Sequence, residues 1–259
     1  MSGEPHIQQW HSTVAPGLAP KPKPELVCFE FAGRHNSDLA AATKRVADSA
    51  VWKRQRIVVI LPASNSISTK VALSHWNLMF PPNNGVARIV AIGQEVGEAY
   101  NNAIESVLAH PDLSTWEYIL TIEHDNIPPP DGVAKLIESL DAHPEFDCIG
   151  GLYWTKGEGG VPQIWGDPKD SVLNFRPQPP QTDTVQECCG TGMGFNLWRM
   201  SFFKDEKLRK PWFKTVFGPE GMGTQDLYFW GDARKHGHRC AIDTRVKVGH
   251  YDQSSDMVW

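Results

Sequence analysis

The sequence predicts an α/β fold in which a mostly parallel central sheet carries helices on both faces. Four short apolar segments of strand length occur between residues 57 and 153. Segments with apolar residues at helical spacing separate them. Strands that alternate with helices favour parallel pairing, because a right-handed crossover brings each new strand back beside the previous one.

The residues before this alternation are expected to contribute little to the core. Residues 1–24 contain five prolines and little periodic hydrophobicity, which predicts a flexible tail. Residues 25–259 are expected to form a single domain. Within it, residues 25–31 are a candidate edge strand, and residues 38–51 have the apolar spacing of a helix.

The core elements then follow in order. The expected strands are residues 57–61, 86–92, 118–122 and 147–153. The expected helices are residues 68–80, 96–109 and 132–142, each with apolar residues on one face. Pro62 is expected to close the first strand, and the pair His110–Pro111 to end the second helix.

The regular pattern loosens after Trp154. Residues 155–187 are rich in Gly, Pro and Asp, which predicts a long loop that either covers a substrate or is a plain surface excursion. The segments after it are read as a turn leading into a strand (190–198), a short helix (200–205), a helix (224–236) and two short strands (239–242 and 245–248). Asp243, in the turn expected between those two strands, is assigned a structural role.

Composition excludes several protein classes. The 259 residues are 41% hydrophobic and 21% charged, as in an ordinary packed domain. A net charge of −5 argues against a protein that coats nucleic acid. We expect no transmembrane segment and no signal peptide, because no apolar run is long enough and the N-terminus lacks the pattern. Five cysteines without CxxC spacing favour free thiols and a cytoplasmic location.

The most informative stretch is YILTIEHDNIPPPD, residues 118–131. An apolar strand ends abruptly in Glu123 and Asp125, and ligands of open α/β sheets bind at that edge. Two carboxylates in this position suit Mg²⁺ or Mn²⁺, and these cations suit a diphosphate. The alternative is that Asp125 and Asn126 only cap a turn. Asp131 is expected to be the N-cap of the following helix.

Other phosphate-binding and catalytic motifs are missing. The sequence has no GxxxxGK[ST], no HExxH and no GxSxG. The glycines of residues 190–194 do not match GxGxxG and lie far from the first strand. The sequence therefore lacks a P-loop, and its glycine pattern argues against a dinucleotide-binding Rossmann protein.

Four segments, in this order, resemble the GT-A glycosyltransferases of the family 2 kind, which are metal-dependent nucleotide-sugar enzymes. They are the strand and loop of residues 56–65, the helix start GEAYNNAI (97–104), the acidic pair at 123–125 followed by GGLY (150–153), and TQDLY (224–228) before Gly249 and His250. The resemblance implies a GT-A-like, Rossmann-like fold for residues 56–259.

The resemblance also implies roles for individual residues. The nucleotide sugar would contact Pro62, Ala63, Asn65, Asn101, Glu123 and Asp125. Asp125 and His250 would hold Mn²⁺ or Mg²⁺. Glu123 stands where the family more often has Asp, so its longer side chain would reach the ribose or a metal-bound water. The sugar or the acceptor would contact Trp154, Gly192, Met193 and Gln225.

Two further departures affect the chemistry. Tyr100 replaces an arginine, so any charge contact made there is lost or supplied elsewhere. Gln225 replaces an acidic residue, which leaves Asp226 as the acid of that pair. An acceptor hydroxyl must lose a proton as it attacks, and Asp226 near a helix N-terminus is a candidate base. The alternative roles are helix capping for Asp226, a solvated side chain for His250 and core packing for Trp154.

The resulting hypothesis is a metal-dependent transferase that moves a sugar from a nucleoside diphosphate sugar to a hydroxyl acceptor, with inversion. The acceptor would be a glycan, a small molecule or a modified nucleic acid. The alternatives are a retaining enzyme of the same fold, a metal-dependent nucleotidyltransferase, and a non-catalytic nucleotide- or carbohydrate-binding module. A nucleotidyltransferase normally has a basic, Gly-rich loop after the first strand, and residues 62–68 are not basic.

Overall fold

The computed structural model describes residues 55–81, 85–218 and 221–259. The expected tail (1–24), edge strand (25–31) and helix (38–51) lie outside these ranges. Within them, the chain forms a mixed α/β fold around a seven-stranded sheet of order β2-β1-β3-β9-β5-β12-β7. The strands are β1 (Ile57–Ala63), β2 (Val86–Ile92), β3 (Tyr118–Ile122), β5 (Cys148–Leu152), β7 (Val185–Cys188), β9 (Phe195–Arg199) and β12 (Cys240–Lys247).

The sheet is mostly parallel, as expected. β1 pairs in parallel with β2 and β3, and β5 pairs in parallel with β12. β9 lies between β3 and β5 and is antiparallel to both, and β7 is antiparallel to β12. Five of the seven strands therefore share one direction. Their carboxyl ends meet at one edge, which is where the sequence places the acidic pair.

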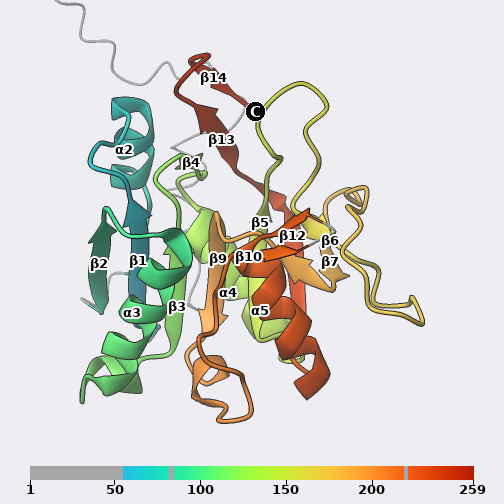
Figure 1. Ribbon diagram of the computed structural model, residues 1–259. Helices are drawn as coiled ribbons and strands as arrows, with labels where there is room; N and C mark the ends of the chain where they lie inside the picture. The colour runs from blue at the N-terminus through green and yellow to red at the C-terminus, as the bar shows by residue number, and fades with distance from the viewer. Residues whose placement is uncertain (1–54, 82–84, 219–220) are drawn as a thin grey trace, which may run out of the picture. The chain divides into compact units, whose positions relative to one another are not determined.

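Helices cover both faces of the sheet (Figure 1). α3 (Val96–Ala109) and α5 (Gln225–Ala233) pack on one face, over a core that includes Trp198 and the α5 residues Phe229 and Trp230. α4 (Gly132–Ala142) packs on the other face with the apolar side that its spacing predicts. The remaining helices are α2 (Thr69–Trp76) and the 3₁₀ turns η2 (Leu113–Thr115), η3 (Phe202–Lys204) and η4 (Arg234–His236).

Short strands tie the C-terminal end of the chain to the acidic stretch. β13 (Gly249–Asp252) pairs with β4 (Asn126–Ile127) and with β14 (Met257–Val258), and this pairing sets His250 opposite Asn126. Two further small sheets join β6 (Ile164–Trp165) to β8 (Gly190–Thr191) and β10 (Val216–Gly218) to β11 (Gly221–Gly223). β4 and β13 are therefore the elements that position the site.

Several expected boundaries are corrected. β1 continues through Pro62, because β3 pairs with β1 only as far as Ile60 and leaves one side of the strand free of partners there. α2 ends at Trp76 instead of residue 80. Leu78 and Phe80, which follow the helix, pack against the core. Residues 155–187 are not one loop, since β6 and the start of β7 lie within them.

The last expected pair of strands is a single strand. β12 runs unbroken from Cys240 to Lys247, with a register irregularity against β5 in place of the expected turn. Asp243 is fully buried in it and its carboxylate accepts from Ser139 Oγ at 2.6 Å and from Arg245, which supports the structural role assigned to it. Asp131 does precede α4, but its carboxylate pairs with Lys135 at 2.8 Å instead of capping the helix.

Four of the five cysteines lie within the described ranges. Cys148, Cys188, Cys189 and Cys240 are buried free thiols, as the missing CxxC spacing suggested. Of the helices that the structure describes, none combines the length and apolar character needed to cross a bilayer.

Candidate functional site

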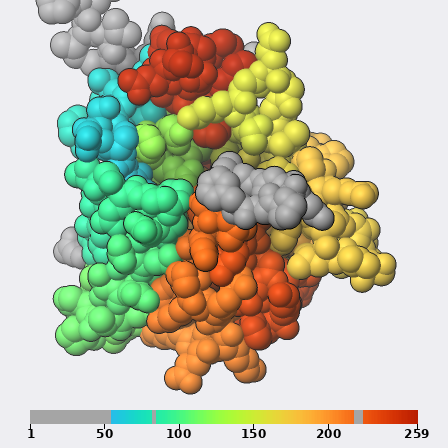
Figure 2. Space-filling model, in the orientation of Figure 1, coloured from blue at the N-terminus to red at the C-terminus, as the bar shows by residue number. Residues whose placement is uncertain are grey.

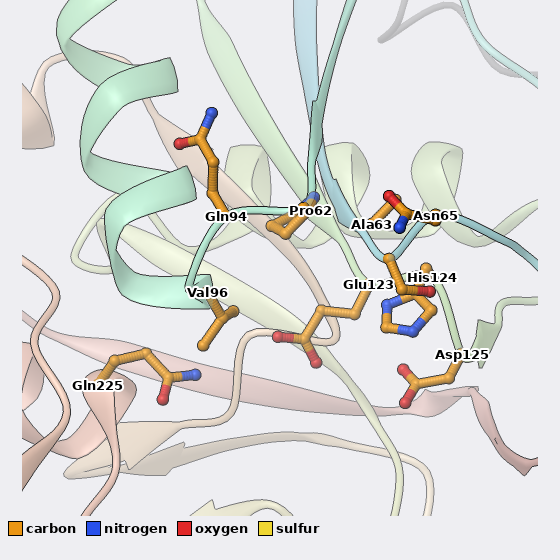
Figure 3. Close-up of a pocket in the computed structure, with 11 residues that line it drawn as sticks. Pro62, Ala63, Asn65, Gln94, Val96, Glu123, His124, Asp125 and Gln225 are labelled. Carbon is orange, nitrogen blue, oxygen red and sulfur yellow. The ribbon is translucent and has the colours of Figure 1, made fainter.

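A cleft of about 500 Å³ opens at the carboxyl ends of β1 and β3 (Figure 3). Its walls come from the end of β1, the turn between β2 and α3, the residues that follow β3, and the first residue of α5. The lining residues are Pro62, Ala63, Ser64, Asn65, Gly93, Gln94, Val96, Glu123, His124, Asp125 and Gln225. Six of the predicted site residues therefore share one cavity, at the edge where α/β sheets bind ligands.

Backbone pairing fixes the walls on the β1 side of the cleft. Ala63 is still in register with Ile92 of β2, and its carbonyl accepts from Gly93 N at 3.0 Å. Gly93 has φ +70°, a conformation that favours glycine, and this turn leads the chain into α3. Glu95 then caps α3 by accepting from Glu98 N at 3.0 Å. The end of β1 and the start of α3 are thus held against each other.

The acidic stretch leaves strand geometry at Ile122 and turns sharply. Asn126 N donates to Glu123 O at 3.1 Å, which closes a turn over residues 123–126. The carboxylates of Glu123 and Asp125 nevertheless point in the same direction, toward the space bounded by Val96 and Gln225 (Figure 3). The Asp125 carboxylate bonds to Lys156 and not to the backbone of the turn. Turn capping therefore does not account for this side chain.

Glu123 is a half-buried carboxyl at the cleft wall whose pKa is raised. Burial is the main cause, and the nearby charges of Asp125 and Asp226 add to it, so its pKa lies at about 8. Tyr100 donates its hydroxyl to Glu123 Oε1 at 3.2 Å, so the residue that replaces an arginine supplies an uncharged contact. At pH 7 the Glu123 carboxyl is mostly neutral and can donate as well as accept a hydrogen bond.

Asp125 has the opposite electrostatic character. Burial alone would raise its pKa, but hydrogen bonds from His250 and Lys156 hold it well below its usual range, so the carboxylate is ionised. Oδ2 lies 3.5 Å from His250 Nε2 and 2.5 Å from Lys156 Nζ. Oδ1 is buried and has no hydrogen-bond partner among the described residues. A buried carboxylate oxygen without a partner is costly in a native protein, and a bound cation would satisfy it.

His250 is oriented by contacts on both sides of its ring. Its Nδ1 lies 2.7 Å from the carbonyl oxygen of Trp154, which can only accept, so Nδ1 carries the proton. Nε2 faces Asp125: it donates to that carboxylate when it carries a proton, and without a proton it can ligate a cation. Tyr153 packs against the ring edge-on, with centroids 5.5 Å apart. Fixing one ring nitrogen on a carbonyl is how proteins orient histidine ligands of metals.

Asp125 and His250 are candidate ligands for a divalent cation that binds together with a nucleotide. No three His, Cys, Asp or Glu side chains in the described ranges cluster closely enough to hold a metal by themselves. Mg²⁺ that is bound together with a nucleotide commonly uses only one or two protein ligands and completes its shell with phosphate and water. The unpartnered Asp125 Oδ1 and the oriented His250 Nε2 supply that number.

Asp226 lies in the first turn of α5, beside this site. Its side chain is buried, and its Oδ1 accepts from Leu227 N at 2.9 Å. Burial raises its pKa, although hydrogen bonds from Thr224 and Leu227 act in the other direction. Its charge contributes to the raised pKa of Glu123, so the two carboxyls are within electrostatic reach. In the cleft itself the neighbouring Gln225, and not Asp226, forms the wall.

Besides His250 and Asp226, four other predicted residues lie outside the cleft lining. Asn101 uses both ends of its amide on the backbone of Phe213, at 2.7 and 3.0 Å, which ties α3 to that segment. Gly192 and Met193 are buried, and a side chain at Gly192 would come within 2.3 Å of the Tyr153 hydroxyl. Trp154 is half-buried and contributes its backbone carbonyl to His250.

The sequence did not point to Lys156, which forms an ion pair with Asp125. The two residues are 31 positions apart, and Lys156 lies in a Gly-rich stretch that carries no motif. Gln94 at the cleft wall was also missed, although its place directly after a strand-ending glycine was a usable signal. In the space-filling view the segment after β5 lies against the C-terminal segment (Figure 2), and the Trp154 carbonyl there contacts His250.

Comparison with known proteins supports the fold. No protein-family model matches the chain, and no curated protein matches it. Among solved structures, the crystal structure of A197 from STIV is similar, with 14% identity and a TM-score of 0.56 over 79% of this chain and 93% of that one. At this identity the likeness shows a shared α/β fold and nothing about activity.

Proposed function

We propose that the protein is a GT-A-like glycosyltransferase that moves a sugar from a nucleoside diphosphate sugar to a hydroxyl acceptor with the help of Mn²⁺ or Mg²⁺. The observation that carries this proposal is the ionised Asp125 beside His250 Nε2, with its buried and unpartnered Oδ1, in a cleft at the strand ends. The likeness of the four sequence segments to family 2 enzymes points to the same chemistry.

In this proposal each group of the cleft has a separate task. Asp125 and His250 would hold the cation, which neutralises charge on the diphosphate as it leaves. Glu123, mostly neutral and bonded to Tyr100, would hydrogen-bond the ribose or a metal-bound water. The walls formed by Pro62, Asn65 and Gln94 would enclose the nucleoside.

The transfer step would be a direct displacement. The acceptor oxygen attacks the anomeric carbon, and the bond from that carbon to the diphosphate oxygen breaks, with the electron pair leaving on the diphosphate. Asp226 takes the proton of the acceptor hydroxyl. Its raised pKa suits a general base better than an ordinary aspartate would, because the proton is transferred more readily to the stronger base.

The composition of the cleft bears on two of the alternatives. No Lys or Arg occurs among the cleft-lining residues that the structure describes. A nucleotidyltransferase would need such cations on the phosphates after β1, so this alternative is less well supported. In a non-catalytic binding module the Asp226 carboxyl beside the cleft would have no chemical task. A retaining reaction on the same fold remains the second candidate.

A donor screen tests the proposal. Each common nucleoside diphosphate sugar is incubated with the full chain and Mn²⁺, and release of the nucleoside diphosphate is measured. We expect slow hydrolysis of one donor or of a related group, and its loss with excess chelator. Hydrolysis of nucleoside triphosphate to monophosphate, with no release from any sugar donor, would instead favour nucleotidyl chemistry.

A further inference from the structure

The Lys156 ammonium group forms an ion pair with Asp125, the carboxylate that is proposed to bind the cation. Its Nζ is 2.5 Å from Asp125 Oδ2, and the two side chains are 33% and 21% exposed. His250 Nε2 approaches the same Oδ2 at 3.5 Å. In the described structure Asp125 is thus satisfied on one oxygen by a cation of the chain itself, while its other oxygen has no partner there.

Lys156 is carried by a small loop whose base is fixed and whose tip is closed by a hydrogen bond from Gly160 N to Gly157 O at 3.1 Å. Thr155 N donates to Val161 O at 2.9 Å, and Val161 N donates to Thr155 Oγ1 at 2.9 Å. Trp154 and Pro162 form an isolated antiparallel β-bridge. Gly157 and Gly159 have φ of +94° and +77°, and no described atom lies within 4 Å of a side chain built at either position. The tip therefore has room to move without disturbing its base.

The base of this loop is also part of the site. The Trp154 carbonyl that fixes His250 immediately precedes the loop, so the histidine keeps its orientation when only the tip moves. Asp252 lies close enough to Lys156 for the ammonium to lower its pKa, although hydrogen bonds from Ser254 and Ser255 are the larger causes. A second carboxylate thus lies within electrostatic reach of Lys156 if it leaves Asp125.

We infer that Lys156 and the divalent cation compete for Asp125, so that cation binding releases Lys156 and the tip of the loop at residues 156–160. This inference rests on the proposed function. The physical reason is that an ammonium and a divalent cation repel each other on one carboxylate, and the cation has the larger charge. Released Lys156 lies near the proposed diphosphate position and supplies a positive charge that the cleft walls lack.

Calorimetric titration with Mn²⁺ alone tests the competition without any knowledge of the donor. Lys156→Met removes the competing charge and keeps much of the side-chain volume, so Mn²⁺ should bind about tenfold more tightly than to the parent. Lys156→Arg keeps the charge and should stay close to the parent. Lys135→Met is the matched control, because it breaks another Lys–Asp pair, 2.8 Å long, outside the cleft.

Each outcome of the titration decides the inference. Equal Mn²⁺ affinity in the parent and in Lys156→Met overturns the competition and leaves the cation site standing. An equal gain in Lys156→Arg also overturns it, because the charge would then not be the cause. Failure of Mn²⁺ to bind any variant, both alone and together with a nucleoside diphosphate, overturns the cation site and the inference together.

Trypsin provides a second readout, because it cleaves after a free lysine. Mn²⁺ should speed cleavage after Lys156 several-fold in the parent but not in Asp125→Asn. Cleavage after Lys156 that does not respond to Mn²⁺ contradicts release of the loop tip.

Discussion

Asp125→Asn is expected to abolish the metal-dependent part of nucleoside diphosphate binding, while the melting temperature stays within a few degrees of the parent. The amide has nearly the shape of the carboxylate but cannot offer two anionic oxygens to a cation. Because the ion pair with Lys156 is partly solvated, its loss should cost no more than about 1 kcal/mol of stability. Calorimetry with and without Mn²⁺, together with thermal denaturation, measures both effects.

The chain offers a closely matched control for this variant. Asp131 is buried and, like Asp125, pairs with a lysine and has an Oδ1 without a hydrogen-bond partner among the described residues, but it lies outside the cleft. Asp131→Asn should leave nucleotide binding unchanged. If Asp125→Asn instead unfolds the protein and Asp131→Asn does not, Asp125 has a structural role and the cation site loses its main support.

Asp226→Asn is expected to fold normally, to bind the donor with Mn²⁺ about as well as the parent, and to transfer sugar about 10²–10⁴-fold more slowly. The amide keeps the oxygen that accepts from Leu227 N at 2.9 Å, so the first turn of α5 is preserved. It cannot take the proton of an acceptor hydroxyl. Loss of a helix cap, by contrast, would lower stability by about 1 kcal/mol and leave the rate intact.

Asp232→Asn is the control for Asp226→Asn, because it changes an aspartate at the other end of the same helix. The Asp232 carboxylate accepts from Arg209 N at 2.8 Å and does not line the cleft. Its transfer rate should match that of the parent. Near-parental transfer by Asp226→Asn would show that another group accepts the proton, and a retaining mechanism would then be favoured.

The sequence predicts the first half of the sheet well, because the signals there are local. β2, α3, β3 and α4 begin and end at the expected residues. Their apolar patterns are strong, and prolines or abrupt polar residues mark their ends. Pro62 was wrongly expected to end β1. The sequence does not reveal that β3 stops pairing with β1 at Ile60, which leaves one side of the strand without a partner at Pro62.

The second half of the sheet depends on contacts that no local pattern reveals. β9 inserts between β3 and β5 in the antiparallel sense, although it follows β5 by more than forty residues along the chain. β12 was divided in two because Asp243 looks like a turn residue. In the fold its charge is buried and paired with Arg245.

The candidate site likewise contains residues that a sequence pattern predicts and residues that it does not. Glu123 and Asp125 could be found from a strand that ends in acids, and the place of His250 beside Asp125 followed from the family resemblance. Lys156 could not be found, because a lysine in a Gly-rich stretch has no preferred partner in sequence. Asn101 matched a motif position, but its amide is used to tie α3 to Phe213.

Titration of the full chain with nucleoside diphosphates, once with Mn²⁺ and once with excess chelator, tests the central claim most directly. The account predicts that one nucleoside diphosphate binds at least tenfold more tightly with Mn²⁺, because the cation joins the diphosphate to Asp125 and His250. Equal affinity with Mn²⁺ and with chelator would contradict the account.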